Sequence, residues 1–194
     1  MTNERSFTIL ADVETRATPY SPDAPGAPLA SRQPTRDAPG VGECVVEVRS
    51  CGLCHTDLGF ADGSVKPKHA LPLVLGHEVV GTVAAAGPDS SHLAGRPVIV
   101  PAVLPCGSCD FCRAGRGNAC PSQKMPGNDI HGGFASHLLV PAAPLVPVDD
   151  APPGLDLDQL SVVADALKRV SWDSTLNNMV GALQPMETRE VQVV

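Results

Sequence analysis

The sequence predicts a mainly β fold, and three observations lead to this expectation. Twenty prolines and eighteen glycines are spread along the 194 residues without forming a low-complexity tract. They separate short apolar segments, which is the pattern of strands joined by tight turns. Aromatic residues make up only 3% of the chain, so the core has to be built from small aliphatic side chains.

Five segments have the length and apolar content of strands: residues 43–50, 77–86, 97–101, 132–141 and 144–149. The first alternates apolar and polar positions, as a half-buried strand does. Residues 18–40 contain six prolines with few apolar residues between them, so we expect a loop there. Short strands with glycine and proline turns assemble into a sandwich or a barrel.

The pattern changes after Pro153, where helical spacing replaces the short strands. Apolar residues recur at Leu157, Leu160, Ala164 and Leu167. This spacing predicts a C-terminal helix that begins near residue 156. Residues 171–194 show only weak periodicity.

Charge and composition exclude several classes of protein. The net charge of −7 argues against nucleic-acid binding, which needs lysine and arginine to displace counterions. No apolar run approaches the roughly 18 residues that span a membrane, and the first residues lack the pattern of a signal peptide. We therefore expect a cytoplasmic protein whose seven cysteines are reduced, which favours metal binding over disulfides.

Four cysteines stand close together in one loop with the spacing Cys-x2-Cys-x2-Cys-x7-Cys: Cys106, Cys109, Cys112 and Cys120. Buried structural cysteines would have apolar neighbours, but this loop contains serine, aspartate, asparagine and two arginines. Four thiolates suit a closed, tetrahedral Zn²⁺ site. An iron–sulfur cluster is the chemical alternative, because it also takes four cysteines.

A second candidate site lies upstream. Cys51 and Cys54 follow the first predicted strand, and His77 begins the next one. A thiolate and an imidazole suit a Zn²⁺ site with an open position, although a third protein ligand is then needed. Either cysteine could be the ligand, and the Cys-x-x-Cys pair by itself could be a redox pair. A histidine in the sequence Gly-His-Glu is, taken alone, more often an ordinary surface or core residue.

Three motifs in this order and spacing resemble the zinc-containing medium-chain dehydrogenase/reductase family, which includes the alcohol dehydrogenases. They are Cys-Gly-x-Cys-His-Thr-Asp at 51–57, Gly-His-Glu at 76–78 and the four-cysteine loop. The resemblance covers residues 5–166 and implies that residues 1–166 form a catalytic domain folded as a partly open, GroES-like β-barrel with a zinc-binding loop. Residues 167–194 then form an unassigned tail.

The resemblance also implies a set of metal ligands. Cys54 and His77 match ligands of the catalytic zinc, and Glu78 matches a carboxylate beside the metal. Asp165 stands where the family has its third ligand, although spacing alone would place it on a solvated helix face. With the structural zinc of the cysteine loop, two zinc ions per chain are expected.

Three further residues take roles from the resemblance. Thr56 matches the hydroxyl that passes on the proton of the alcohol, and Asp57 matches an acceptor that orients His77. His55 matches a residue that contacts the pyrophosphate of NAD. The implied substrate is a small alcohol, and a homo-oligomer is possible. Residues 125–138 resemble the branch that oxidises 6-hydroxycyclohex-1-ene-1-carbonyl-CoA.

One expected part of the family pattern is missing from this chain. A dinucleotide-binding Rossmann domain carries G-x-G-x-x-G between a strand and a helix. After Pro141 only Gly154 and Gly181 remain, so we expect no such domain within these residues. Two functions follow: the catalytic domain of an alcohol dehydrogenase, inactive alone, or a zinc-stabilised binding and assembly module.

Overall fold

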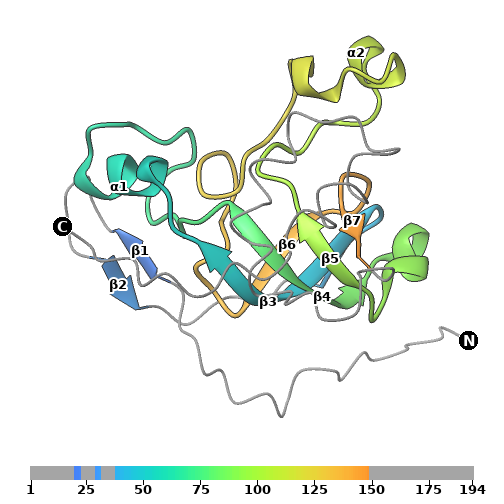
Figure 1. Ribbon diagram of the computed structural model, residues 1–194, viewed down its shortest axis with the longest axis horizontal. Helices are drawn as coiled ribbons and strands as arrows, with labels where there is room; N and C mark the ends of the chain where they lie inside the picture. Colours follow the sequence, from blue (N-terminus) through green and yellow to red (C-terminus); the bar gives the residue numbers. More distant parts are fainter. Residues whose placement is uncertain (1–19, 23–28, 32–37, 149–194) are drawn as a thin grey trace, which may run out of the picture.

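The computed structural model describes residues 20–22, 29–31 and 38–148. Its main feature is a five-stranded antiparallel sheet with the strand order β6-β3-β4-β5-β7 (Figure 1). The strands are β3 (Glu43–Gly52), β4 (Glu78–Ala86), β5 (Pro97–Val100), β6 (His137–Pro141) and β7 (Val146–Pro147). The prediction of a mainly β domain is confirmed.

The core forms on the side of the sheet where the alternating apolar residues of neighbouring strands meet. Val46 of β3, Val79 and Val83 of β4, and Val98 of β5 are at most 1% exposed. Successive side chains of a strand point to opposite faces, and the alternating residues Val80 and Ile99 are buried as well, so these strands are covered on both faces. The low aromatic content therefore suits a core that is aliphatic almost throughout.

Within residues 38–148, four short helical segments connect the strands. They are α1 (His55–Asp62), the 3₁₀ helix η1 (Pro88–Leu93), α2 (Asp110–Arg113) and the 3₁₀ helix η2 (Gly117–Ala119). Phe60 of α1 packs with Leu73 and Leu75 in a second, smaller cluster. In the described ranges, none of the helices combines the length and apolar character needed to cross a bilayer.

Two details of the predicted strands are wrong. Residues 18–40 were expected to form a loop, but a small antiparallel pair, β1 (Tyr20–Pro22) and β2 (Leu29–Ser31), lies there. The strand expected over 132–141 begins only at His137. Residues 132–134 instead bond through their amides to the carbonyls of residues 74–76. The helix expected from residue 156 lies outside the described residues.

Candidate metal centres

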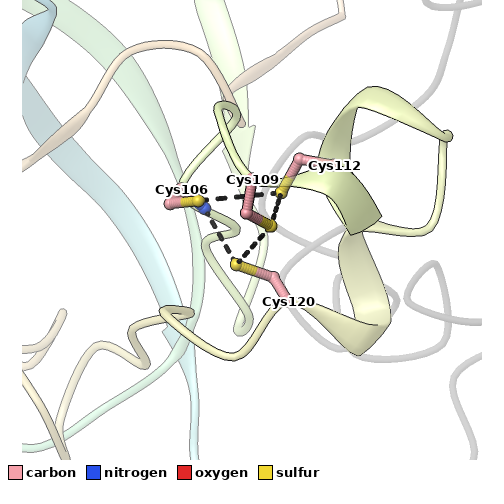
Figure 2. A group of neighbouring side chains, drawn as sticks. All are labelled: Cys106, Cys109, Cys112 and Cys120. Atoms are coloured by element: carbon pink, nitrogen blue, oxygen red, sulfur yellow. Dashed lines mark hydrogen bonds between the residues drawn. The ribbon is translucent and has the colours of Figure 1, made fainter.

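The four-cysteine loop leaves the sheet after β5 and carries both α2 and η2. It projects away from the strands in Figure 1, and its four cysteine side chains point toward one another in Figure 2. The sulfur–sulfur distances are 3.9 Å for Cys106–Cys112, 3.4 Å for Cys109–Cys112 and 3.8 Å for Cys109–Cys120. A tetrahedral zinc with bonds of about 2.3 Å to sulfur requires edges of about 3.8 Å. The loop therefore has the dimensions of a closed Zn²⁺ site.

The same distances exclude disulfides in this loop, because a sulfur–sulfur bond is about 2.05 Å long. All seven cysteines are free. Hydrogen bonds from the backbone and the hydroxyl of Ser108 lower the pKa of Cys106 to about 6. This thiol is largely a thiolate at neutral pH, which is the form that binds zinc. Desolvation and the neighbouring Cys109 raise the pKa of Cys112 to about 12, so a metal would have to displace its proton.

Apart from the sulfurs, local backbone hydrogen bonds and a few side-chain contacts hold this loop in shape. Arg113 donates to the carbonyl oxygen of Ser108 and to Oδ1 of Asp110, the latter at 2.6 Å. The guanidinium of Arg116 lies 5.2 Å from the centre of the Phe111 ring. These charged groups are exposed, and exposed ion pairs contribute little to stability.

The second group of ligand atoms comes from Cys54, His77 and Glu78, and these atoms all lie within 4.8 Å of one another. Cys54 caps the N-terminus of α1, two residues after β3 ends, and His77 directly precedes β4. Because β3 and β4 pair, with Gly52 opposite Glu78, the sheet brings these distant residues together. Sγ of Cys54 lies 3.1 Å from Nε2 of His77.

Asp57 ties the two sides of this centre together. Its Oδ2 accepts from the backbone amide of Cys54 at 3.0 Å, and its Oδ1 accepts from the amide of Gly76 at 3.0 Å. Burial by itself raises the pKa of Asp57, but His77 and these amides outweigh that effect, so the net pKa is lowered. Asp57 is thus a buried carboxylate that fixes the residues on both sides of the ligand atoms.

His77 is 2% exposed and is oriented for metal binding. Its Nδ1 lies 3.4 Å from Oδ1 of Asp57. Within the described ranges, this Nδ1 is the one buried side-chain nitrogen or oxygen without an aligned hydrogen bond. With its proton on Nδ1 facing the carboxylate, the ring presents the lone pair of Nε2 to Cys54. This is the arrangement in which histidine binds zinc.

Glu78 reaches the centre because of a glycine on the neighbouring strand. A Cβ atom added to Gly52 would overlap with Oε2 of Glu78. The side chain of Glu78 occupies this space, and the residue is only 7% exposed. Gly76 is constrained in another way: its φ of 96° and its contact with the amide of Phe134 exclude a side chain there.

Cys51 lies outside the group of ligand atoms formed by Cys54, His77 and Glu78. Its Sγ packs against Gly76 and Gly133, where added Cβ atoms would lie 2.8 and 3.0 Å away. Burial raises the pKa of Cys51 to about 12, the neighbouring carboxylates adding to the effect. A thiol that keeps its proton is a poor ligand and a poor nucleophile. The geometry therefore favours Cys54 over Cys51.

The remaining predicted residues lie on or near α1, or outside the described residues. Thr56 is half-buried in the first turn of α1, and the neighbouring His55 is exposed. Asp165 lies outside the described residues. The sequence analysis did not predict α1, the cap that Asp57 forms, or the space that Gly52 leaves for the side chain of Glu78. An Asp three residues after Cys54 was the available signal, because a carboxylate at this position often caps a helix.

The β domain thus carries two groups of side chains that could hold a metal ion, the four sulfurs of the loop and the Cys54, His77 and Glu78 group. The sequence model of the alcohol dehydrogenase GroES-like domain matches residues 40–150. The chain therefore belongs to this family.

Several relatives support this assignment. An alcohol dehydrogenase of Geobacillus stearothermophilus is 36% identical over 125 residues, which are 63% of this chain and 37% of the relative. L-galactonate-5-dehydrogenase of Escherichia coli (strain K12) is 32% identical over 136 residues, or 69% and 40% of the two chains. The chain thus spans well under half the length of the curated relatives it matches.

Solved structures show the same fold. An NAD-dependent alcohol dehydrogenase is 31% identical, with a TM-score of 0.65 over 75% of this chain and 42% of the other. A thermostable alcohol dehydrogenase from Pyrobaculum aerophilum, solved with cobalt and zinc bound, is 28% identical. Its TM-score is 0.65 over 76% of this chain and 44% of the other.

Proposed function

We propose that this chain is the zinc-binding catalytic part of an alcohol dehydrogenase, with one structural and one catalytic zinc. The observation that carries the proposal is the convergence of Cys54, His77 and Glu78 at the ends of two paired strands. A scaffold held by the cysteine loop alone has no need of a second, buried group of ligands.

The catalytic zinc would be held by Cys54 and His77, with Glu78 beside it and Asp165 as the third protein ligand. When bound, the metal supplies Lewis-acid polarisation of an alcohol oxygen and lowers the pKa of its hydroxyl. The four-cysteine loop would hold the structural ion, since four sulfurs leave no position for a substrate.

The other residues act on protons and orientation. Thr56, in the first turn of α1, would take up the hydroxyl proton at its Oγ and pass it toward solvent. Asp57 would keep His77 in the tautomer that leaves Nε2 unprotonated. His55 is exposed next to Cys54, as a contact for the pyrophosphate of NAD requires.

Hydride transfer needs a nicotinamide cofactor in addition to these residues. The 194 residues contain no G-x-G-x-x-G after Pro141. We therefore expect this chain by itself neither to bind NAD⁺ measurably nor to oxidise alcohols at a useful rate. Its free cysteines suit a reducing, cytoplasmic compartment.

The substrate is the finer part of the proposal. A secondary alcohol is expected from the family, and residues 125–138 favour a cyclic alcohol carried as a CoA thioester. Assays of the chain, alone and with separately expressed dinucleotide-binding domains, should compare a cyclic secondary alcohol with its CoA thioester. If only the free alcohol and not the thioester were oxidised, the CoA-linked substrate would be contradicted. The proposal of a dehydrogenase would remain intact.

Metal content and NAD⁺ titration test the proposal as a whole. We expect two zinc ions per chain by elemental analysis and no heat of NAD⁺ binding by calorimetry. One zinc per chain would favour the alternative, a zinc-stabilised binding and assembly module. Micromolar NAD⁺ binding with turnover would show that residues beyond the described ranges, or a partner subunit, supply a nucleotide site.

A further inference from the structure

Two histidines from distant segments of the chain lie against each other. The rings of His69 and His131 lie 4.8 Å apart, centre to centre, and are inclined by 51°. Backbone bonds join the same segments: the amide of His69 donates to the carbonyl of Asn128 at 2.8 Å, and the amide of Lys68 to Oδ1 of Asn128 at 3.0 Å. The proposed ligands and proton-transfer residues do not include either histidine.

The hydrogen bonds fix which nitrogen of each ring carries a proton. Nδ1 of His69 faces the carbonyl of Ala70, which can only accept, so this nitrogen is protonated. Nδ1 of His131 lies 3.3 Å from the amide of Val74, which can only donate, so this nitrogen must be unprotonated. The doubly protonated form of His131 cannot keep the bond to Val74.

Val74 begins the segment that leads into the metal centre. Its carbonyl accepts from the amide of Gly132 at 2.8 Å, and the carbonyl of Gly76 accepts from the amide of Gly133 at 2.8 Å. Gly76 is in turn bound to Asp57 and directly precedes His77. The bond between His131 and Val74 is thus the outermost link in a short chain of contacts that ends at a proposed ligand.

We propose that neutral His131 is a positioning residue for the Cys54–His77 centre, and that its protonation releases Val74 and loosens that centre. The part that concerns metal binding rests on the proposed function, whereas the link between His131 and Val74 does not. Protonation of His131 in mild acid would then lower the affinity of this centre for its metal.

The surroundings of His131 oppose its protonation. His131 is an exposed residue. Even so, partial desolvation and, to a smaller extent, the nearby His69 lower the pKa of His131 from its ordinary value of 6.5. The other charged groups at this junction are Lys68 and Asp129, which pair with each other at 3.2 Å. When the bond to Val74 is broken, His131 takes up a proton more readily than when the bond is intact. The form with the intact bond therefore loses stability as the pH falls through 6.5.

Amide hydrogen exchange of the full chain tests the link directly. The protection factor of the Val74 amide should be constant above pH 7.5. It should fall about three- to tenfold as His131 is protonated, the change expected for the loss of one net hydrogen bond. Imidazole NMR titration of the same sample gives the pKa of His131. A Val74 amide whose protection does not follow this titration would overturn the proposal.

Three variants separate positioning from a general loss of structure. H131N keeps an acceptor near the position of Nδ1 but cannot titrate, so Val74 protection should be preserved and independent of pH. H131A should lose that protection at every pH, and H92N, in η1, should behave as the original chain. If H131A does not fold, the titration of the original chain and of H131N still decides the matter.

Cobalt binding links this device to the metal centre. The original chain should lose cobalt affinity at the Cys54–His77 centre more steeply with falling pH than H131N does, as measured by the thiolate-to-cobalt absorption. Equal slopes would overturn the coupling. Absence of a second cobalt site at any pH would contradict the proposed function, and Val74 exchange would still report on His131.

Discussion

The four-cysteine loop and the Cys54–His77 centre bring their ligand atoms together in opposite ways. The loop gathers its sulfurs from 15 residues, 106–120, on a projection whose other contacts are mostly local backbone hydrogen bonds. The second centre takes its ligand atoms from residues 54, 77 and 78, and two paired strands and a buried carboxylate hold them. We infer that the loop needs its metal to be folded, whereas the second centre is built before a metal arrives.

The largest effect should come from the loop. Replacing Cys109 by Ser removes one of four sulfurs from a segment that is otherwise held mainly by local backbone hydrogen bonds, so one zinc should be lost and the loop should unfold locally. Elemental analysis and hydrogen exchange over residues 106–120 measure both effects, with protection of β3 and β4 retained. Cys44→Ala, a buried cysteine outside both sites, is the control. Unchanged zinc content in Cys109→Ser would contradict the assignment.

The second centre should lose its metal without losing its structure. Cys54→Ala should remove the other zinc, while Cys51→Ala should leave it bound, because Cys51 is a protonated thiol outside the ligand group. Circular dichroism and the exchange of β4 amides should be unchanged in Cys54→Ala. If both variants lost zinc equally, the choice of ligand would be wrong.

A smaller effect should follow from Asp57→Asn. The amide can still accept one hydrogen bond but cannot match both backbone donors and the charge beside His77. Affinity for the second zinc should fall about 10- to 100-fold, as for other residues that orient a metal-binding histidine. Competition with a chelator measures this constant. Zinc in the cysteine loop should be held as tightly as before, which makes that loop an internal control.

Acid stability should depend on the same carboxylate. The pKa of Asp57 is lowered in the folded protein, so its contribution is present above the ordinary value of 3.8 and is lost as the pH falls through the folded value. In the metal-free protein, urea unfolding followed between pH 6 and pH 3 should show a shallower loss of stability for Asp57→Asn. Parallel curves would mean that Asp57 does not titrate as the fold implies.

The smallest effect should come from the exposed edge of the loop. Arg116→Ala removes the guanidinium from the face of Phe111 and should lower the stability of the loop by about 0.5–1 kcal/mol. Arg116→Lys should recover part of it. Zinc release rates at the cysteine loop measure the difference. A tenfold faster release in the Ala variant would show that side-chain contacts support this loop more than we infer.

The same contrast explains what could be predicted from the sequence. The loop could be recognised because its ligands are neighbours in the chain, so their spacing alone predicts a metal site of four sulfurs. A site formed by His77 and one of two cysteines could be proposed from the residues, but only the resemblance selected Cys54, because the register between β3 and β4 is a property of the folded sheet. The role of Gly52 was hidden for the same reason, and α1 was missed because it is short and contains Gly59 amid mixed residues.

Gly52, the glycine opposite Glu78, leaves a space beside the sheet that the carboxylate of Glu78 fills. Gly52 contributes no ligand atom to the centre. The carboxylate of Glu78 can nevertheless lie there only because residue 52 has no side chain. Adding one methyl group there would displace the carboxylate of Glu78 while leaving Cys54 and His77 unchanged. Gly52→Ala, a substitution on the neighbouring strand, would thus remove one negative charge from the centre by displacing the carboxylate of Glu78.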